Sequence, residues 1–322
     1  MLPNTEKTRK MGSHKNQYKE VASIKLSCYF DILNKILTSV STHSKQTTDL
    51  NACLQKQVQE IPKDVIAIYD RGYGSHIIPF WHDKNGSKYI IRLKTEFSNT
   101  VKKFMQSNDN EVLITEPLSE RCYKVLEKFG IRKSKKDTIT YRLVKIILPT
   151  GETEVLMTNL DNTFTINDLG ELYRLRWGIE TCFFCLKSHQ MLGIFSGYSE
   201  EVILQDIWAN LLFYNMQSIT NLEANLRAKQ ISQKRKNKPS KNKKKENLGY
   251  QVNRNIGAGI LRTYWFDLWE KRDKELEQVL EEMQIYYLQS LEMIKPKRAE
   301  RKRKMIRTND RHQTEWNYKR GF

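Results

Sequence analysis

NDLGELYRLRWGIETCFFCLKSHQ, residues 167–190, is the stretch that decides the fold expected for this chain. Thr165 and Asp168 stand three residues apart at its start, which is the pattern of a capping box at a helix N-terminus. No proline interrupts the stretch. We therefore expect one continuous helix over these residues.

The expected helix has an apolar stripe. At about 100° per residue, five hydrophobic side chains fall in one arc of the helical wheel. They are Leu172, Leu175, Ile179, Phe183 and Leu186. A stripe of this width predicts a helix that packs against the core.

A second arc beside the stripe carries polar chemistry. Tyr173, Arg176, Glu180 and Lys187 follow one another at helical spacing, and Trp177 comes directly after the arginine. A carboxylate between cations has two interpretations. One is a surface ion pair between Arg176 and Glu180. The other is a site where the carboxylate holds a divalent metal ion and the cations hold phosphates.

The spacing Tyr-x2-Arg-x3-Glu-x6-Lys, with Trp after the Arg, resembles the signature of the insertion-sequence-four family of DDE transposases. The resemblance covers roughly residues 1–225. It implies an α/β fold, a ribonuclease-H-like core interrupted by a β-strand insertion, with a helical basic C-terminal region. It also implies DNA binding, metal-dependent DNA strand cleavage and strand transfer in the transposition of an insertion sequence, a mobile element.

A second acid follows residues 65–70, VIAIYD, where Arg71-Gly72-Tyr73 comes next. A short β-branched run that ends in Asp and a glycine turn indicates a buried strand with a carboxylate at its C-terminal edge. The alternative is an Asp that merely opens a turn. Family members carry Asp-Arg-Gly-aromatic at this point, so Asp70 resembles their second catalytic aspartate.

The resemblance implies that Asp70 and Glu180 are the catalytic acids and the metal ligands. Carboxylate oxygens suit Mg²⁺, with Mn²⁺ as the alternative ion. The residues implied to bind DNA are Tyr173, Arg176, Trp177 and Lys187. Of these, Trp177 would stack on a displaced base, and membership of the core is its alternative role.

The first acid of the family has no counterpart in the sequence. Family members place it in an Asp-Gly-Ser/Thr stretch on the first core strand, just before a Leu-Pro-like segment such as Leu2-Pro3. We therefore expect an N-terminally truncated chain in which the first core strand is missing. Asp31 is the nearest substitute, but it falls in an expected hairpin turn. Two carboxylates do not hold two Mg²⁺ ions as three do, so we expect impaired activity.

Composition bounds the partners. The 322 residues include 55 Lys+Arg and 37 Asp+Glu, a net charge of +18. Such a charge attracts polyanions, with nucleic acid as the first expectation and an anionic membrane as the second. No apolar run approaches the roughly 18 residues of a membrane span, and the five cysteines form no disulfide framework.

We expect a soluble bacterial cytoplasmic protein at the nucleoid. By resemblance, its partners are double-stranded DNA (transposon ends and target) and, in a DNA-dependent homodimer, a second copy.

Hydrophobic periodicity along the rest of the chain predicts where its strands and helices lie. Strands are expected at residues 20–30, 36–41, 65–70, 89–94, 111–114, 138–148 and 153–160, and helices at 50–61, 77–81, 200–225 and 253–294, with a loop at 1–19. The expected domains are 1–88 and 163–225 for the two parts of the core, 89–162 for the β insertion, and 226–322 for a basic arm, helix and tail.

Residues 227–245, RAKQISQKRKNKPSKNKKK, hold ten cations and no acid. We expect a flexible arm that contacts the DNA backbone, and a surface loop kept soluble by charge is the alternative. Residues 295–307 form a second basic run, expected as a frayed tail.

Two further functions remain open. One is a non-catalytic DNA-binding remnant of a transposase, which would use the basic arm and the cationic helix without cleavage. The other is a ribonuclease-H-like nuclease of the host, which has no need of Tyr173, Arg176 and Lys187 at those spacings.

Overall fold

The computed structural model describes residues 2–15, 18–132, 137–148, 151–236 and 249–294, and only the backbone of 234–236. The chain divides into two units. The sheet unit comprises Met11–Ile32 and Thr38–Thr181, and the helical unit comprises Met1–Lys10, Leu33–Leu37 and Cys182–Phe322.

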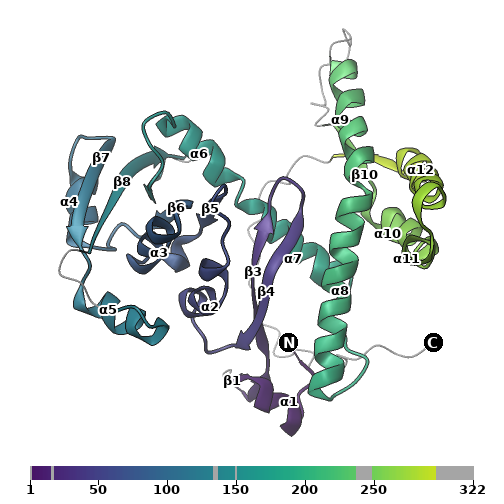
Figure 1. The fold of residues 1–322 in the computed structure, drawn as a ribbon, viewed down its shortest axis with the longest axis horizontal. Coiled ribbons are helices and arrows are strands. Elements are labelled where there is room, and N and C mark those ends of the chain that lie inside the picture. The colour runs from purple at the N-terminus through teal and green to yellow at the C-terminus, as the bar shows by residue number, and fades with distance from the viewer. Residues whose placement is uncertain (1, 16–17, 133–136, 149–150, 237–248, 295–322) are drawn as a thin grey trace. The chain divides into compact units, whose positions relative to one another are not determined.

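A five-stranded mixed sheet forms the centre of the sheet unit, in the order β5-β6-β9-β8-β7 (Figure 1). Its strands are β5 (Ile66–Tyr69), β6 (Lys88–Leu93), β7 (Glu111–Pro117), β8 (Thr138–Ile147) and β9 (Thr153–Thr158). β5 and β6 run parallel, and every other pair in this sheet is antiparallel. The expected α/β class is confirmed.

Helices cover both faces of this sheet. On β6, Tyr89 and Ile91 point into a core shared with the helices between residues 49 and 126, whereas Ile90 points to the opposite face, where Leu169 packs. The alternation follows from the period of two along a strand. β6, β8 and β9 are therefore apolar on both faces, as the strands inside a three-layer arrangement must be.

The α-helices of the sheet unit are α2 (Asp49–Gln55), α3 (Ile77–Asn85), α4 (Asn99–Gln106), α5 (Glu120–Leu126) and α6 (Ile166–Arg174), with the 3-10 turns η1 (Gln57–Gln59), η2 (Arg71–Tyr73) and η3 (Glu127–Phe129). All but one of these α-helices begin at a side-chain cap; the exception is α3, where His76 at the N-cap position makes no capping hydrogen bond. Thr48, Ser98 and Ser119 accept hydrogen bonds from the first turns of α2, α4 and α5. Each hydroxyl satisfies an amide that the helix leaves without an internal partner.

The strands expected from hydrophobic alternation are confirmed except for the single strand at 20–30, which is divided at Ser23 into β2 (Glu20–Ala22) and β3 (Ile24–Asp31), and these pair in different sheets. The region expected as a β insertion differs in two details. The region 89–162 also contains α4 and α5, which are amphipathic helices too short for a clear period of 3.6. In addition, its strands pair with one another and, through β6, with β5, so they belong to the same sheet as Asp70.

The N-terminal segment is structured, contrary to the loop expected for residues 1–19. It forms α1 (Glu6–Met11) and β1 (Ser13–Lys15), which pairs with β2 (Glu20–Ala22). Thr8 is completely buried and its hydroxyl donates to the carbonyl of Pro3, which explains why a polar sequence forms a turn here. β3 (Ile24–Asp31) and β4 (Ile36–Ser44) form the expected hairpin.

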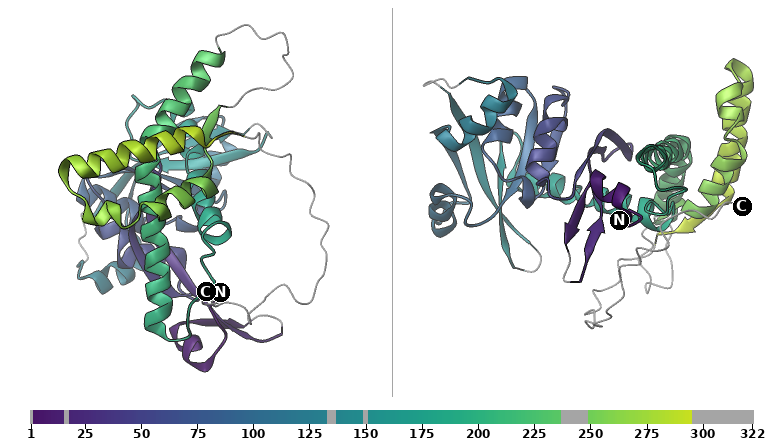
Figure 2. Two further views of the ribbon diagram at one scale, coloured as in Figure 1. Left: turned by 90° about the vertical axis from the view of Figure 1, so that its right-hand side faces the viewer. Right: turned by 90° about the horizontal axis from the view of Figure 1, so that it is seen from below.

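The helical unit is built on two long helices, α8 (Glu200–Thr220) and α9 (Leu222–Lys236). α10 (Arg254–Thr263) and α12 (Asp273–Gln289) pack against them, as the views in Figures 1 and 2 show. The short helix α11 (Asp267–Glu270) and the strand pair β10 (Tyr250–Val252) and β11 (Leu291–Met293) complete the unit. The expected single helices over 200–225 and 253–294 are therefore wrong in detail, because each is interrupted.

The expected flexible arm is wrong for residues 227–236, which continue α9. Ala224, Ala228 and Ser232 recur every four residues and are all buried, so one edge of the helix packs closely despite its charge. Lys and Arg are also good helix formers. Residues 237–245 and the basic run 295–307 lie outside the described residues.

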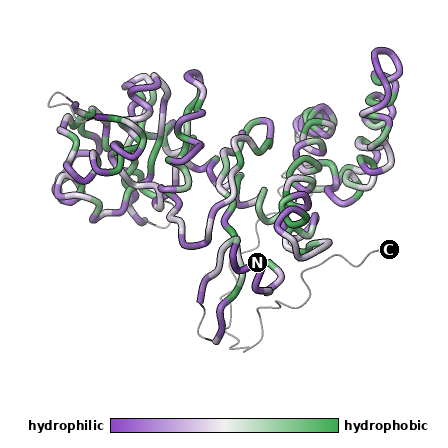
Figure 3. Tube along the Cα trace, turned by 60° about the horizontal axis from the view of Figure 1, so that its bottom comes forward, coloured by the Kyte–Doolittle hydropathy of each residue, from purple (hydrophilic) through white to green (hydrophobic). Residues whose placement is uncertain are grey.

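Hydropathy follows this arrangement. In Figure 3, the helices mix hydrophobic and hydrophilic positions along their length. Within the described ranges, none of the helices combines the length and apolar character needed to cross a membrane.

Candidate active site

The signature stretch forms two helices instead of the single one expected. α6 ends at Arg174 and α7 (Trp177–Ser188) begins three residues later. Between them the amides of Leu175, Arg176 and Gly178 each donate to the carbonyl three residues back, at 3.1, 3.1 and 2.9 Å. This is 3-10 geometry, which turns more tightly than an α-helix and shifts the faces that follow it.

Because of this shift, the buried residues differ from the expected apolar stripe. Leu175 is 44% exposed, whereas Cys182, Cys185 and Leu186 are buried. Gly178 lies against Phe30, and a Cβ there would come within 3.3 Å of the Phe30 ring. The junction therefore packs through backbone and glycine rather than through the predicted leucine.

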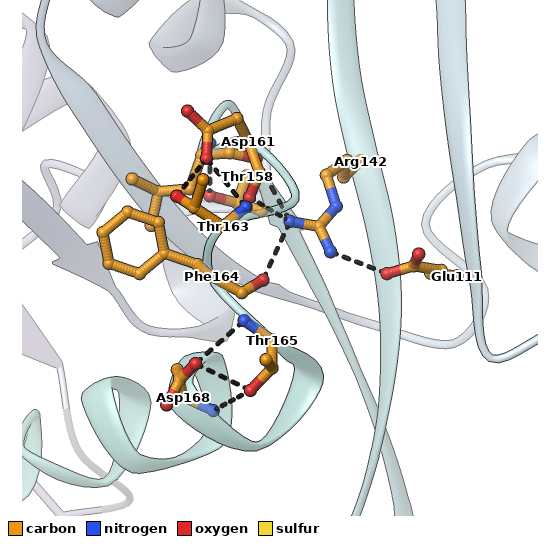
Figure 4. A network of polar contacts seen from close by, with 9 residues as sticks. Glu111, Arg142, Thr158, Asp161, Thr163, Phe164, Thr165 and Asp168 are labelled. Atoms are coloured by element: carbon orange, nitrogen blue, oxygen red, sulfur yellow. Dashed lines mark hydrogen bonds and ion pairs between the residues drawn. The ribbon is translucent and has the colours of Figure 1, made fainter.

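Two sets of hydrogen bonds fix the start of α6. Thr165 and Asp168 form the predicted capping box, so each satisfies a backbone amide of the other. The loop before it is held by Arg142 of β8, whose Nη1 donates to the carbonyls of Leu160, Asp161 and Phe164 and whose Nη2 bonds Glu111 at 2.6 Å (Figure 4). These contacts attach the loop that leads into α6 to the sheet.

Asp70 lies immediately after β5, as predicted from the β-branched run. It begins the 3-10 turn η2, and its Oδ1 accepts a hydrogen bond from the amide of Arg71 at 2.7 Å. Its side chain is 44% exposed. The carboxylate is thus held by its own backbone while one side stays open to solvent.

Two residues of the signature, Tyr173 and Arg176, contact this carboxylate, and Arg176 links it to a third, Glu180. The Tyr173 hydroxyl donates to Asp70 Oδ1 at 3.2 Å. Arg176 Nη1 lies 3.7 Å from Asp70 Oδ2 and 2.9 Å from Glu180 Oε1. Two acids that are 110 positions apart in the sequence therefore share one nitrogen atom of one guanidinium.

The electrostatics of this group keep its charges fixed. Burial, with a smaller contribution from Asp70, raises the pKa of Tyr173 to about 12, so the phenol stays protonated and donates. Burial alone would lower the pKa of Arg176, but the hydrogen bond to Glu180 and the charge of Asp70 raise it. The Arg176 side chain is 11% exposed and its Nε is buried without a hydrogen-bond partner among the described residues.

Trp177 and Lys187 are placed differently. Trp177 is 53% exposed, and the Arg176 guanidinium lies 5.0 Å from its ring centre, within range of a cation–π contact. Its alternative role as a core residue is wrong. Lys187 is exposed and lies in the part of α7 that belongs to the helical unit, so its relation to the acids rests on helix spacing alone.

Sequence reasoning missed Arg92. This arginine on β6 bonds Glu154 at 2.7 Å, and its hydrogen bond to Tyr173 acts to lower the pKa of that phenol. β5 and β6 pair in parallel with Tyr69 opposite Ile91, so Arg92 comes one position later, next to Asp70. The available signal was a cation between the apolar residues Ile91 and Leu93 of the strand KYIIRL.

The acids provide oxygen donors for a metal ion, but only two of them. In the part of the chain that the structure describes, no group of three Asp, Glu, His or Cys residues is placed to hold a metal. Asp31 therefore does not complete a set with Asp70 and Glu180; it is the last residue of β3 rather than part of a turn. Cys182 and Cys185 are free, buried cysteines.

Comparison with known proteins identifies a family for most of the chain. A family model described as the transposase DDE domain matches residues 3–216, which include β5, α6 and α7. A search of curated proteins finds no match. The match spans well over half of the chain and contains both acids, so this chain belongs to the family of the transposase DDE domain.

Proposed function

We propose that this transposase has a ribonuclease-H-like core that cuts DNA and transfers strands in the transposition of an insertion sequence. The observation that carries the proposal is the convergence of Asp70 and Glu180 on Arg176. Their presence within the family match supports it. In this role both acids are catalytic.

Magnesium, or manganese in its place, is the ion we propose for the acid pair. Mg²⁺ is commonly held by one or two carboxylates together with substrate phosphates. Asp70 and Glu180 are 44% and 47% exposed, so an ion and a phosphate can reach both. A bound divalent ion would polarise a phosphodiester and promote formation of the attacking oxygen nucleophile.

The cations around the acids have a separate task. The Arg176 guanidinium presents a fork suited to phosphate oxygens, and its side chain is 11% exposed. Tyr173 stays protonated and holds Asp70 in place. We propose that Arg176, Tyr173 and Lys187 bind phosphates of the transposon end, and that the exposed Trp177 ring stacks on a displaced base.

Two carboxylates support one divalent ion better than two. Among the described residues no third ligand accompanies them. The two-metal reaction stabilises both the attacking and the leaving oxygen, so a single ion loses part of that stabilisation. We therefore propose weak cleavage by this chain alone.

The second candidate function is DNA binding without cleavage. It is favoured by the same shortage of acids and by the ion pair that Arg176 makes with Glu180. In either function the partner is double-stranded DNA at the nucleoid, and the assembly that we propose is a homodimer formed on paired ends.

Cleavage of DNA that carries the element's own ends distinguishes the two functions. With Mg²⁺ present, we expect slow cutting by the chain and none by Glu180→Gln or Asp70→Asn, because each removes one of only two ligands. Glu171→Gln is the matched control, since Glu171 is an exposed glutamate on α6 whose ion pair is with Arg174. Equal rates for the chain and Glu180→Gln would refute the catalytic role and leave DNA binding.

Metal binding gives a readout that does not require activity. Titration with Mn²⁺, followed by its paramagnetic resonance signal, should show one bound ion and at least about tenfold weaker binding in Asp70→Asn. Binding that is identical in Asp70→Asn, Glu180→Gln and Glu171→Gln would place the ion elsewhere.

A further inference from the structure

The helical unit contains a cavity that the proposed chemistry does not use. It has a volume of about 130 Å³ and lies among the turn between β3 and β4, the end of α7, and helices α8, α9 and α10. Lys35, Lys229 and Arg254 line it, with His189 beside them. None of the described residues that line it is an Asp or Glu. A small cavity with three cations and no acid is built for an anion.

The turn that carries Lys35 is fixed within the helical unit. The Leu37 amide donates to Asn215 Oδ1 at 2.8 Å, and Asn215 Nδ2 donates back to the Leu37 carbonyl at 2.9 Å. Lys35 itself has a φ of 57°, in the left-handed region that lysine rarely adopts. Asn or Gly would suit this backbone better, so a lysine here points to a use for its charge.

The cations repel one another when the cavity is empty. Burial lowers the pKa of Lys35, and the charges of Arg254 and Lys229 lower it further. Lys35 also reaches solvent, so water screens part of this repulsion. Burial lowers the pKa of Arg254, against the opposing effects of Cys182 and Glu292.

Glu292 does not neutralise the cavity. It does not line the cavity, and its carboxylate already accepts hydrogen bonds from Asn253 at 2.8 Å and Gln251 at 3.2 Å. Among the described residues, neither Lys35 nor Lys229 forms an ion pair with an acid, so a bound anion would supply the charge that these two lysines lack.

Two amide groups in the lining also lack a partner. The side-chain oxygens of Asn221 and Gln190 are buried without hydrogen bonds among the described residues, and Asn221 is only 7% exposed. Unpaired buried polar atoms are rare and call for a ligand or water. A half-turn of either terminal amide exchanges its oxygen and nitrogen and presents donors to an anion.

We propose that this cavity binds a phosphate group, supplied either by a DNA backbone or by a free nucleotide. The cavity volume is about four times the roughly 30 Å³ that one water molecule occupies, so a group of a few heavy atoms fits inside. A phosphate offers enough acceptor oxygens to engage Lys35, Lys229 and Arg254 together. The inference is independent of cleavage at Asp70 and Glu180.

Calorimetric titration of the full chain tests this site with three probes: inorganic phosphate, a deoxynucleoside monophosphate and a single-stranded oligonucleotide. We expect Lys35→Asn and Lys229→Gln to weaken binding about tenfold or more, because each removes a charged partner. Lys274→Gln is the matched control, since Lys274 is an exposed lysine of α12 that does not line the cavity. Asn suits the left-handed backbone at position 35, so Lys35→Asn should melt no lower than the parent chain.

The probes separate the two sources. If Lys35→Asn and Lys229→Gln lose affinity for the monophosphate alone, the cavity is assigned to a free nucleotide. If they lose affinity for the oligonucleotide, the cavity is assigned to the DNA backbone. Asp70→Asn should bind inorganic phosphate and the monophosphate as the parent chain does, so failure here and failure of cleavage are distinguishable. Equal affinities in Lys35→Asn, Lys229→Gln and Lys274→Gln would overturn the proposal.

Discussion

His82 is a buried histidine whose ring is fully used by the fold. Its Nε2 lies 2.9 Å from the Tyr69 hydroxyl and its Nδ1 lies 2.7 Å from Ser87 Oγ. The side chain is 0% exposed, and burial lowers the pKa of His82 to about 3. The folded chain therefore holds this ring neutral at pH values where an unfolded histidine is charged.

Folding stability should fall as the pH drops below the unfolded pKa of His82. Between pH 6.5 and 3 the unfolded chain binds one more proton at this residue, so acid favours unfolding. We expect a loss of about 2 kcal/mol in the free energy of unfolding between pH 7 and pH 5. Urea denaturation at both pH values measures it.

A His82→Gln variant isolates this contribution. His76, whose pKa burial also lowers, acts in the same direction and remains in the variant. His82→Gln should be less stable overall because it disturbs the hydrogen bonds to Tyr69 and Ser87, yet it should lose less stability between the two pH values. The same pH dependence in both proteins would mean that His82 does not carry it.

The residues of the candidate site differ in how far sequence could predict them. Tyr173, Arg176 and Glu180 share one short stretch, so local spacing keeps them close even across the junction between α6 and α7. Asp70 needed both a strand pattern and a family resemblance. Arg92 reaches the site through strand pairing between β5 and β6, which is a long-range contact that no local pattern encodes.

At the scale of the element, Arg142 is the residue that joins β8 to the loop before α6. It is 6% exposed and its guanidinium bonds three carbonyls and Glu111 (Figure 4). Arg142→Met keeps much of the volume but leaves three carbonyls without this donor. We expect a loss of about 3 kcal/mol in the free energy of unfolding, measured by chemical denaturation.

Arg121→Met provides the comparison for Arg142→Met. Arg121 is an exposed arginine on α5, so the same change there should shift stability by less than about 0.5 kcal/mol. If Arg142→Met were equally harmless, the loop before α6 would have to hold its position through the Thr165–Asp168 capping box and its own hydrogen bonds at Asp161.

The ends of the signature helix were easier to predict than its interior. The capping box is a local pattern of two side chains, and the structure has it as expected. The 3-10 junction depends on the close approach of Gly178 to Phe30, a residue of β3. A helical wheel assumes a constant turn per residue, so it could not place Leu175 on the exposed side.

At the scale of the molecule, alternation along the strands predicted the α/β class and five strands of the sheet, but not their order. The order β5-β6-β9-β8-β7 depends on pairings such as Ile90 with Thr158, far apart in sequence. The expected arm at 227–245 failed in its first half because charge suggested a solvated segment, whereas Ala224, Ala228 and Ser232 give α9 a buried edge.

Net charge is the property of the whole chain that governs its affinity for DNA. At +18, the chain should bind duplex DNA with an affinity that falls steeply as salt rises, because each phosphate contact releases a counterion. Lys241, Lys243, Lys244 and Lys245 belong to the acid-free segment, beyond the described residues. If each contacts one phosphate, changing all four to Gln should lower the slope of log affinity against log salt by about 3 to 4.

A second quadruple variant separates contact from general attraction. Lys63, Lys103, Lys124 and Lys128 are exposed lysines of the sheet unit, and changing them to Gln removes the same total charge. If the lysines act only through the overall charge, both variants should lower the salt slope equally. If the lysines of 241–245 contact phosphates directly, only the first variant should lower it, since screening weakens distant charges at physiological salt. Fluorescence anisotropy with duplex DNA at several salt concentrations measures both slopes. Equal slopes would mean that the lysines of 241–245 act only through general electrostatic attraction, and this would contradict a DNA-contacting role for that segment.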